Sequence, residues 1–259
     1  MFNKVARAGE LAIDAIKSRY SRDYQLNDGD RGEINFIDVG SVGGLPEPWR
    51  QNAFRIAFLL NFEPNGPITR GNHSMTYNTA LWNDSCELDF YVYRGNNSRR
   101  SGSSLFEQNF DYVTENFETL SKQGPPNLAK TWHQRSETID TKKMICKPLD
   151  VVLREELGGR PFHFTKIDAQ GAEYEILSGA KDFLSTTCVG MELELFRVPL
   201  YKNIRLVDEV TEFLAGFGFS LAKKFPPHGT FDSQNNCVFI HDERSPELQS
   251  IIRDVYGIS

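Results

Sequence analysis

The stretch that decides the fold is residues 34–44, which reads INFIDVGSVGG. Its run of apolar residues predicts a buried parallel strand that carries Asp38 near its end, and a glycine-rich turn follows. Glycine lets the backbone turn tightly and approach a ligand closely because it has no Cβ. The pattern is typical of a nucleotide-type cofactor site in a doubly wound α/β protein, although plain connections after strands share this glycine spacing.

Strands and helices alternate along the rest of the chain. We expect strands at 57–62, 75–81, 88–93, 138–146, 162–167, 188–196, 217–223 and 236–240. We expect helices at 49–56, 149–157, 172–183, 207–216 and 246–255. The alternation predicts one Rossmann-like α/β domain over residues 31–259, with a mainly parallel sheet covered by helices on both faces. We expect an accessory helix at residues 1–30. We expect a polar insertion at residues 94–135, and we interpret its RGNNSRRSGSSL segment as a surface loop.

Composition limits the classes of function. The net charge of -6 argues against a general nucleic-acid binder, because phosphate binding needs a basic surface. No apolar run approaches the roughly 20 residues that span a bilayer, so we expect a cytoplasmic protein without a transmembrane segment. The N-terminal helix has basic residues on one side, and peripheral contact with anionic lipid is its alternative role. Four widely spaced cysteines indicate buried free thiols rather than a zinc site or disulfides.

Polar residues end successive predicted strands, at the edge of the sheet where ligands bind. They are Asp38, Glu63, Asn83 with Asp84, Asp168 and Glu194. Glu63 is placed to accept hydrogen bonds from both hydroxyls of a ribose. Pro46 and Pro48 remove backbone donors after the glycine turn, which disfavours a pyrophosphate and favours an adenosyl ligand without phosphates.

Six segments carry a resemblance to a known family. They are DVG at 38–40, FEP at 62–64, SSL at 103–105, PLD at 148–150, KIDAQGAEYEILSGA at 166–180 and ELELFRVPLY at 192–201. In this order they resemble the FkbM-type family of S-adenosylmethionine-dependent methyltransferases. The form DVGSVGGLPEPW is similar to a subgroup with a glycine-leucine-proline turn, and it has Val42 where the commoner motif has Asn. The resemblance implies a class I methyltransferase fold with a seven-stranded sheet.

The resemblance also implies S-adenosylmethionine as the cofactor and assigns residues to it. The methionine part would lie near Asp38, Gly40, Ser41 and Gly44, the ribose near Glu63, and the adenine edge near Asn83 or Asp84. Asp168 would face the methyl group and is the first candidate for the base. Glu173 and Glu194 are further catalytic candidates, with helix capping as the alternative for Glu173 and a hydrogen-bonded polar network for Glu194.

Family members typically methylate hydroxyls, so the resemblance implies O-methylation of a sugar hydroxyl on a glycan, glycolipid or secondary metabolite. Candidate acceptor-binding residues are Arg99, Arg100, Ser103, Ser104, Trp132 and Tyr201. The arginines and serines could hold a phosphate or carboxylate, and Trp132 could stack on a sugar. Carboxylates including Asp168 and Glu173 could ligate Mg²⁺, but no dense ligand spacing requires it. The oligomeric state stays open.

Two other classes of function remain. One is a nicotinamide-dependent oxidoreductase on the same fold, and the other is a non-catalytic relative that binds a glycan or a protein partner. Among the histidines, His163 is expected to be a core residue, whereas His133 and His228 fall in predicted loops from which either could reach an acceptor.

Overall fold

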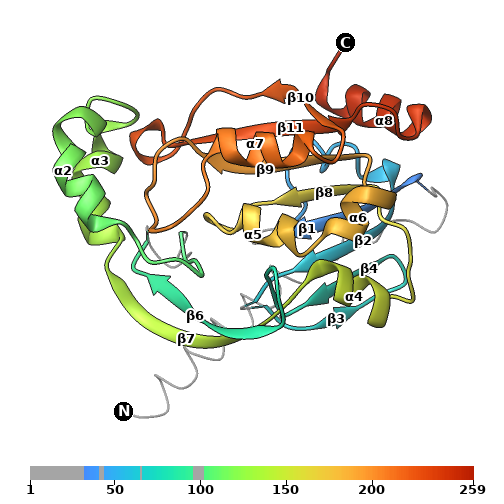
Figure 1. The fold of residues 1–259 in the computed structure, drawn as a ribbon, viewed down its shortest axis with the longest axis horizontal. Helices are drawn as coiled ribbons and strands as arrows, with labels where there is room; N and C mark the ends of the chain where they lie inside the picture. The colour runs from blue at the N-terminus through green and yellow to red at the C-terminus, as the bar shows by residue number, and fades with distance from the viewer. Residues whose placement is uncertain (1–31, 41–43, 65, 96–101) are drawn as a thin grey trace, which may run out of the picture.

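The structure is a computed structural model that describes residues 32–40, 44–64, 66–95 and 102–259 (Figure 1). The predicted N-terminal helix with its proposed lipid contact, and the candidate residues Ser41, Arg99 and Arg100, lie outside these residues. No helix in the described ranges is both long enough and apolar enough to cross a membrane.

A mixed sheet of eight strands forms the centre of the described chain, in the order β10-β11-β9-β8-β1-β2-β4-β3. Its strands are β1 (Ile34–Val39), β2 (Ile56–Phe62), β3 (Thr69–Arg70), β4 (Ser74–Tyr77), β8 (Phe164–Ile167), β9 (Gly190–Phe196), β10 (Phe219–Lys224) and β11 (Gln234–His241). The neighbours from β9 to β4 run parallel, which confirms the mainly parallel sheet. The expected seven strands are wrong, because the short β3 pairs antiparallel with β4 and adds an eighth.

Helices cover both faces of this sheet (Figure 1). Four lie on one face: α4 (Leu149–Glu155), α5 (Glu173–Ser178), α6 (Lys181–Thr186) and α7 (Val207–Ala215). The other face packs against α8 (Pro246–Tyr256) and the segment that carries Trp49. Neighbouring residues Phe36 and Ile37 of β1 therefore enter different cores, and both are fully buried. Burial on both faces explains why these strands are continuously apolar.

A second sheet and two helices form a lobe beside the central sheet (Figure 1). The sheet has the order β5-β7-β6, with β5 (Ala80–Leu81), β6 (Cys86–Tyr93) and β7 (Thr138–Lys147), and the helices are α2 (Phe110–Leu120) and α3 (Pro126–Arg135). We call α2, α3 and this sheet the lobe. Part of the insertion is therefore helical rather than a loop, because Val113, Leu120 and Trp132 bury an apolar side of the two helices against a common core.

Three other predicted elements differ from the structure. Residues 49–56 form turns and the short 3-10 helix η1 (Ala53–Arg55) instead of an α-helix. The strand expected at 75–81 is divided between β4 and β5, which belong to different sheets. The helix expected at 172–183 breaks at Gly179, where a Cβ would lie 2.2 Å from the Trp82 carbonyl oxygen, so the chain needs glycine at this close approach.

A buried polar chain ties α8 to the sheet. The indole N–H of Trp49 donates to the Tyr256 hydroxyl at 2.9 Å, and that hydroxyl donates to Glu192 Oε2 at 2.5 Å. Glu192 lies in β9 and is 3% exposed. A buried carboxyl group is energetically costly without hydrogen bonds. Tyr256 of α8 therefore supplies a hydrogen bond that the Glu192 carboxyl group in the sheet needs.

We predict that Tyr256→Phe lowers the free energy of unfolding by about 1–3 kcal/mol, because it leaves Glu192 and the Trp49 indole without their shared partner. Urea denaturation followed by circular dichroism measures the change. Tyr174→Phe is the matched control, since the Tyr174 ring packs on Phe213 and its hydroxyl makes no hydrogen bond to a described residue. Equal destabilisation by the two substitutions would contradict the prediction.

Candidate active site

The site forms where the strand order reverses, between β1 and β8. Gly40 follows β1 with a φ of 80°, and a Cβ there would lie 2.1 Å from the Asp168 carbonyl oxygen. The Gly40 N–H donates to the Phe62 carbonyl at 2.9 Å, and the Asp168 N–H donates to the Val39 carbonyl at 3.1 Å. The ends of β1, β2 and β8 therefore meet, and only glycine fits at the contact.

Two carboxyl groups predicted to bind the cofactor lie at this edge. Glu63 follows β2 and is 7% exposed. Asp38 is 2% exposed, and its Oδ1 has no hydrogen-bond partner among the described residues. Burial raises the pKa of Asp38 to about 7. Gly44 is exposed beyond the turn, with a φ of 87°.

The structure places Asn83 and Asp84 away from the end of a central strand. Both are exposed and follow β5 of the second sheet. The Asn83 amide donates to Glu175 of α5, and Asp84 accepts from the Ser85 N–H at 2.7 Å. The central strand in this region is β4, which ends at Tyr77. Asn78 therefore follows the strand at the ligand-binding edge, and sequence reasoning missed it by joining β4 and β5 into one strand.

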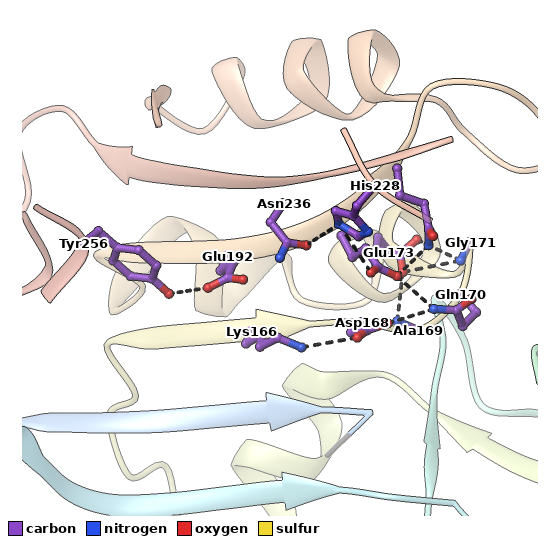
Figure 2. A network of polar contacts seen from close by, with 12 residues as sticks. Lys166, Asp168, Ala169, Gln170, Gly171, Glu173, Glu192, His228, Asn236 and Tyr256 are labelled. Carbon is purple, nitrogen blue, oxygen red and sulfur yellow. Dashed lines mark hydrogen bonds and ion pairs between the residues drawn. The ribbon is translucent and has the colours of Figure 1, made fainter. Parts of the chain in front are cut away.

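Gln170 connects the groups around Asp168 (Figure 2). Its Nε2 donates to Asp168 Oδ1 at 2.9 Å and to Glu194 Oε2 at 2.8 Å. Its Oε1 accepts from the Tyr201 hydroxyl at 3.1 Å. The Gln170 backbone has a φ of 52°, in the left-handed region that a residue with a side chain adopts at an energetic cost. The side-chain amide thus holds two carboxyl groups together, a role that no sequence motif pointed out.

Lys166 supplies the positive charge of the site. It lies between Asp38 of β1 and Glu192 of β9 in the strand register, and its Nζ is 3.4 Å from Asp168 Oδ2 (Figure 2). Burial alone would lower the pKa of Lys166, but the surrounding carboxyl groups more than reverse this and hold it above the usual value. The ammonium group therefore stays charged.

The pKa values of the two acids that Gln170 bridges are shifted in opposite directions. Burial acts to raise the pKa of Asp168, but Lys166 and the Gln170 amide outweigh it, so the pKa lies below its usual value. Burial and the neighbouring Asp168 raise the pKa of Glu194 well above its usual value. Glu194 Oε2 also accepts from Gln234 at 2.6 Å, and its Oε1 lies 3.8 Å from His228 Nε2. The shifts therefore favour the ionised form of Asp168 and the protonated form of Glu194.

Glu173 supports the turn that carries Asp168. It is the first residue of α5 and is 3% exposed. Its Oε1 accepts from the Ala169 N–H at 2.8 Å, and its Oε2 accepts from the Gly171 N–H at 3.0 Å (Figure 2). Burial nevertheless raises the pKa of Glu173 to about 8. These hydrogen bonds hold the turn before α5 and do not reach the N–H groups of the helix itself, so both the capping and the catalytic role of Glu173 stay predictions.

A cavity of about 230 Å³ opens between the sheet edge and the lobe. Its lining residues come from three regions: the sheet edge with Gln170, Glu194 and Phe196, the lobe with Tyr93, Gly102, Gln108, Leu128, Trp132, Arg135 and Ser136, and two later segments with Leu200, Tyr201, Gly229, Thr230, Ser233 and Gln234. Trp132 and Tyr201, both predicted to bind the acceptor, are therefore brought together with Glu194.

The two serines predicted to bind the acceptor have hydrogen-bond partners within the protein. Ser104 is buried, and its hydroxyl donates to the Gln170 carbonyl at 2.7 Å. The Ser103 hydroxyl accepts from the Tyr93 N–H at 3.4 Å. His163 accepts the Asn35 N–H at 3.2 Å, a structural role, and the His133 ring packs on aromatic side chains of α2 and α3.

Metal binding finds no support at the site. The described residues contain no group of three or more His, Cys, Asp or Glu side chains that could hold a metal ion. Lys166 already forms an ion pair with Asp168, one of the acids considered as magnesium ligands.

A Rossmann-like sheet with polar residues at the point where its strand order reverses is typical of doubly wound α/β proteins, which bind ligands at this edge. The family model of the methyltransferase FkbM domain matches residues 49–221, more than half of the chain. The chain therefore belongs to the FkbM methyltransferase family. The match begins after the glycine turn, so the subgroup assigned from DVGSVGGLPEPW stays a prediction.

Two solved structures are similar to the chain. The crystal structure of methyltransferase FkbM from Methylobacillus flagellatus KT matches with a TM-score of 0.42 and 12% identity, over 85% of this chain and 46% of that chain. The magnesium protoporphyrin IX methyltransferase from Synechocystis PCC 6803, solved with bound S-adenosylmethionine, matches with a TM-score of 0.37 and 12% identity, over 92% of this chain and 82% of that chain. This chain thus spans less than half of the Methylobacillus protein. No curated protein matches it.

We predict that Glu173→Gln makes stability less dependent on pH. The pKa of Glu173 is raised from 4.5 to about 8, so above pH 4.5 the unfolded chain releases a proton that the folded protein keeps. Stability of the wild type therefore falls as the pH rises towards 8. Relative to wild type, the variant should gain about 1–3 kcal/mol between about pH 5 and pH 8. Urea denaturation at several pH values measures this.

The test is how the difference in unfolding free energy between variant and wild type changes with pH. Its value at one pH is no test, because the glutamine amide also fits the two N–H donors less well than the carboxyl group does. Asp38 also has a raised pKa, but it is present in both proteins and cancels. A difference in stability that does not vary with pH would show that Glu173 titrates alike in the folded and unfolded states.

Proposed function

We propose that this protein is an S-adenosylmethionine-dependent methyltransferase that methylates an oxygen, the hydroxyl of a sugar on a glycan, glycolipid or secondary metabolite. The observation that carries the proposal is an ionised Asp168 at the switch point of an FkbM-family chain, next to a cavity of sugar-like size. Membership in the family supports methyl transfer, and the polar cavity supports a hydroxylated acceptor.

The residues at the sheet edge fit the proposed cofactor. Gly40 lets the ends of β1 and β8 meet, because a Cβ there would lie 2.1 Å from the Asp168 carbonyl oxygen, and Asp38 has a buried oxygen without a partner among the described residues. Glu63 ends the neighbouring strand, where a carboxylate can accept hydrogen bonds from ribose hydroxyls. Asn83 and Asp84 remain candidates for the adenine edge together with Asn78. When bound, S-adenosylmethionine supplies an electrophilic methyl group on a positively charged sulfur.

The chain's own residues would orient the acceptor and remove its proton. Asp168 would accept the proton of the acceptor hydroxyl, and S-adenosylmethionine, when bound, would supply the methyl group to the same oxygen. Lys166 keeps Asp168 ionised, and Gln170 fixes one of its oxygens. The raised pKa of Glu194 favours its protonated form, so Asp168 is the first candidate for the base. Alignment of the two reactants provides much of the acceleration in such a displacement.

Asp168→Asn should lower kcat by about 10²–10⁴, the usual contribution of a general base, and leave the Kd for S-adenosylmethionine within a few-fold. The rate of S-adenosylhomocysteine formation and calorimetric titration measure the two quantities. Asp242→Asn, at an exposed position, is the control and should change neither. A large loss of cofactor affinity in Asp168→Asn would instead make Asp168 a cofactor-binding residue.

The function itself is tested by cofactor binding and product formation. Calorimetry should detect S-adenosylmethionine but not NAD, and labelled S-adenosylmethionine incubated with host sugar-nucleotide and glycolipid extracts should give a labelled O-methylated sugar. Binding of NAD alone would indicate an oxidoreductase. Cofactor binding without S-adenosylhomocysteine from any acceptor would indicate a non-catalytic relative, and label on a nitrogen or a peptide would refute the acceptor class.

Glu63→Ala should raise the Kd for S-adenosylmethionine about 10- to 100-fold, because two hydrogen bonds to a charged group are lost. Glu118→Ala is the control, since the Glu118 side chain is 92% exposed on α2. An unchanged Kd in Glu63→Ala would exclude Glu63 as the ribose ligand.

A further inference from the structure

Among the described residues that line the cavity between the sheet edge and the lobe, Arg135 is the only cation. It ends α3, and its guanidinium group is partly buried. Its Nη2 donates to the Leu128 carbonyl at 2.9 Å and to the Thr230 hydroxyl at 2.8 Å, and its Nε donates to the Thr131 hydroxyl at 3.1 Å. All three partners are neutral, and no described carboxylate forms an ion pair with Arg135.

A partly buried cation without an acid partner is energetically costly. The Nη1 group of Arg135 also makes no hydrogen bond to a described residue, so donors remain for a ligand. A guanidinium group binds the two oxygens of a carboxylate or phosphate through parallel hydrogen bonds. The cavity thus presents an unpaired group whose preferred partner is an oxyanion.

Two further atoms of the cavity wall lack partners. Gln108 Oε1 and Ser233 Oγ are buried and make no hydrogen bond to a described residue. Buried polar atoms in native proteins are nearly always hydrogen-bonded, so a ligand is expected to supply what the chain does not. Gln108 Oε1 needs a donor, and Ser233 Oγ can donate or accept, which suits the hydroxyl groups of a sugar.

The wall that carries Ser233 is held in a strained conformation. Phe231 and Asp232, in the 3-10 helix η3 (Thr230–Asp232), have φ values of 62° and 48°, in the left-handed region. Phe231 is 1% exposed, and its ring lies 6.1 Å from that of Trp132. Strain of this kind persists only where the surrounding packing enforces it. The packing of Phe231 therefore fixes Thr230 and Ser233 on either side of it.

The size of the cavity limits the ligand. Its volume of about 230 Å³ is below the roughly 300–1,000 Å³ of pockets for drug-sized ligands, so it accommodates about one sugar ring. The one acid that lines it, Glu194, is engaged by the side-chain amides of Gln170 and Gln234.

We propose that this cavity binds an acceptor with one anionic group, a carboxylate or a phosphate, held by Arg135 while Gln108 and Ser233 bind its hydroxyls. The inference rests on the proposed function only for the further step that a hydroxyl of this ligand is methylated near Asp168. The binding of an anionic sugar is a property of the cavity and can be measured without turnover.

The test compares a neutral sugar with two anionic ones. Methyl glucoside, methyl glucuronoside and glucose 6-phosphate are titrated into the protein, and the Kd of each is measured by ligand-observed NMR. At least one anionic sugar should bind at least about ten-fold tighter than methyl glucoside. Arg135→Gln should abolish this preference, Arg135→Lys should retain part of it, and Arg154→Gln should retain it fully, because Arg154 is exposed on α4.

Ser233→Ala tests the cavity independently, in case the Arg135 variants do not fold. It removes a hydroxyl without a partner, so it should leave the unfolding temperature unchanged and weaken sugar binding several-fold. Tighter binding of methyl glucuronoside would indicate a uronic acid as the ligand, and tighter binding of glucose 6-phosphate would indicate a sugar phosphate. Equal binding of neutral and anionic sugars, no binding of either anionic sugar, or an unchanged preference in a folded Arg135→Gln protein overturns the inference.

The same titrations keep this inference separate from the proposed function. S-adenosylmethionine binding and S-adenosylhomocysteine formation test methyl transfer, and they do not depend on the charge preference. A protein that methylates neutral sugars as well as anionic ones retains the proposed function and loses the role of Arg135. A protein that binds anionic sugars but not S-adenosylmethionine retains the anion site and loses the function.

Discussion

The carboxyl edge of the central sheet depends on one buried cation, Lys166. It is flanked by Asp38 and Glu192 in the neighbouring strands and contacts Asp168 at 3.4 Å. Without its charge, three acids would share a poorly solvated region, and the pKa of each would rise. A raised pKa would make Asp168 harder to ionise. Lys166 and the Gln170 amide together keep the pKa of Asp168 low, whereas burial and the neighbouring Asp168 raise the pKa of Glu194.

Features local to the sequence were predicted well. The apolar run before Asp38 and the glycine after it predicted β1 and its turn, and Gly40 is required because the turn lies against the end of β8. The KIDAQGAE segment marked the second half of the site, and the pairing of β1 with β8 confirms that the two motifs are neighbours in space. Such features depend on backbone shape over a few residues, which side-chain size and spacing encode directly.

Features that depend on distant contacts could not be predicted. The split between β4 and β5 depends on which sheet each strand joins, and the residues at 75–81 favour a strand in either case. The two helices of the lobe bury short apolar sides against Phe231, which lies about a hundred positions later. Gln170 was not singled out, because an amide in a turn becomes a bridge only when Asp168, Glu194 and Tyr201 converge on it. The unpaired charge of Arg135 is invisible until its neutral partners are known.

The walls of the cavity come from separate parts of the chain. The sheet edge contributes Gln170, Glu194 and Phe196, whereas the other walls come from residues between 93 and 136, residues 200–201 and residues between 229 and 234. The regions contact one another, for example through the Ser104 hydroxyl with the Gln170 carbonyl and Gln234 with Glu194. Selection of the acceptor can therefore diverge between related proteins through substitutions in the lobe, while the sheet edge and its chemistry are inherited unchanged.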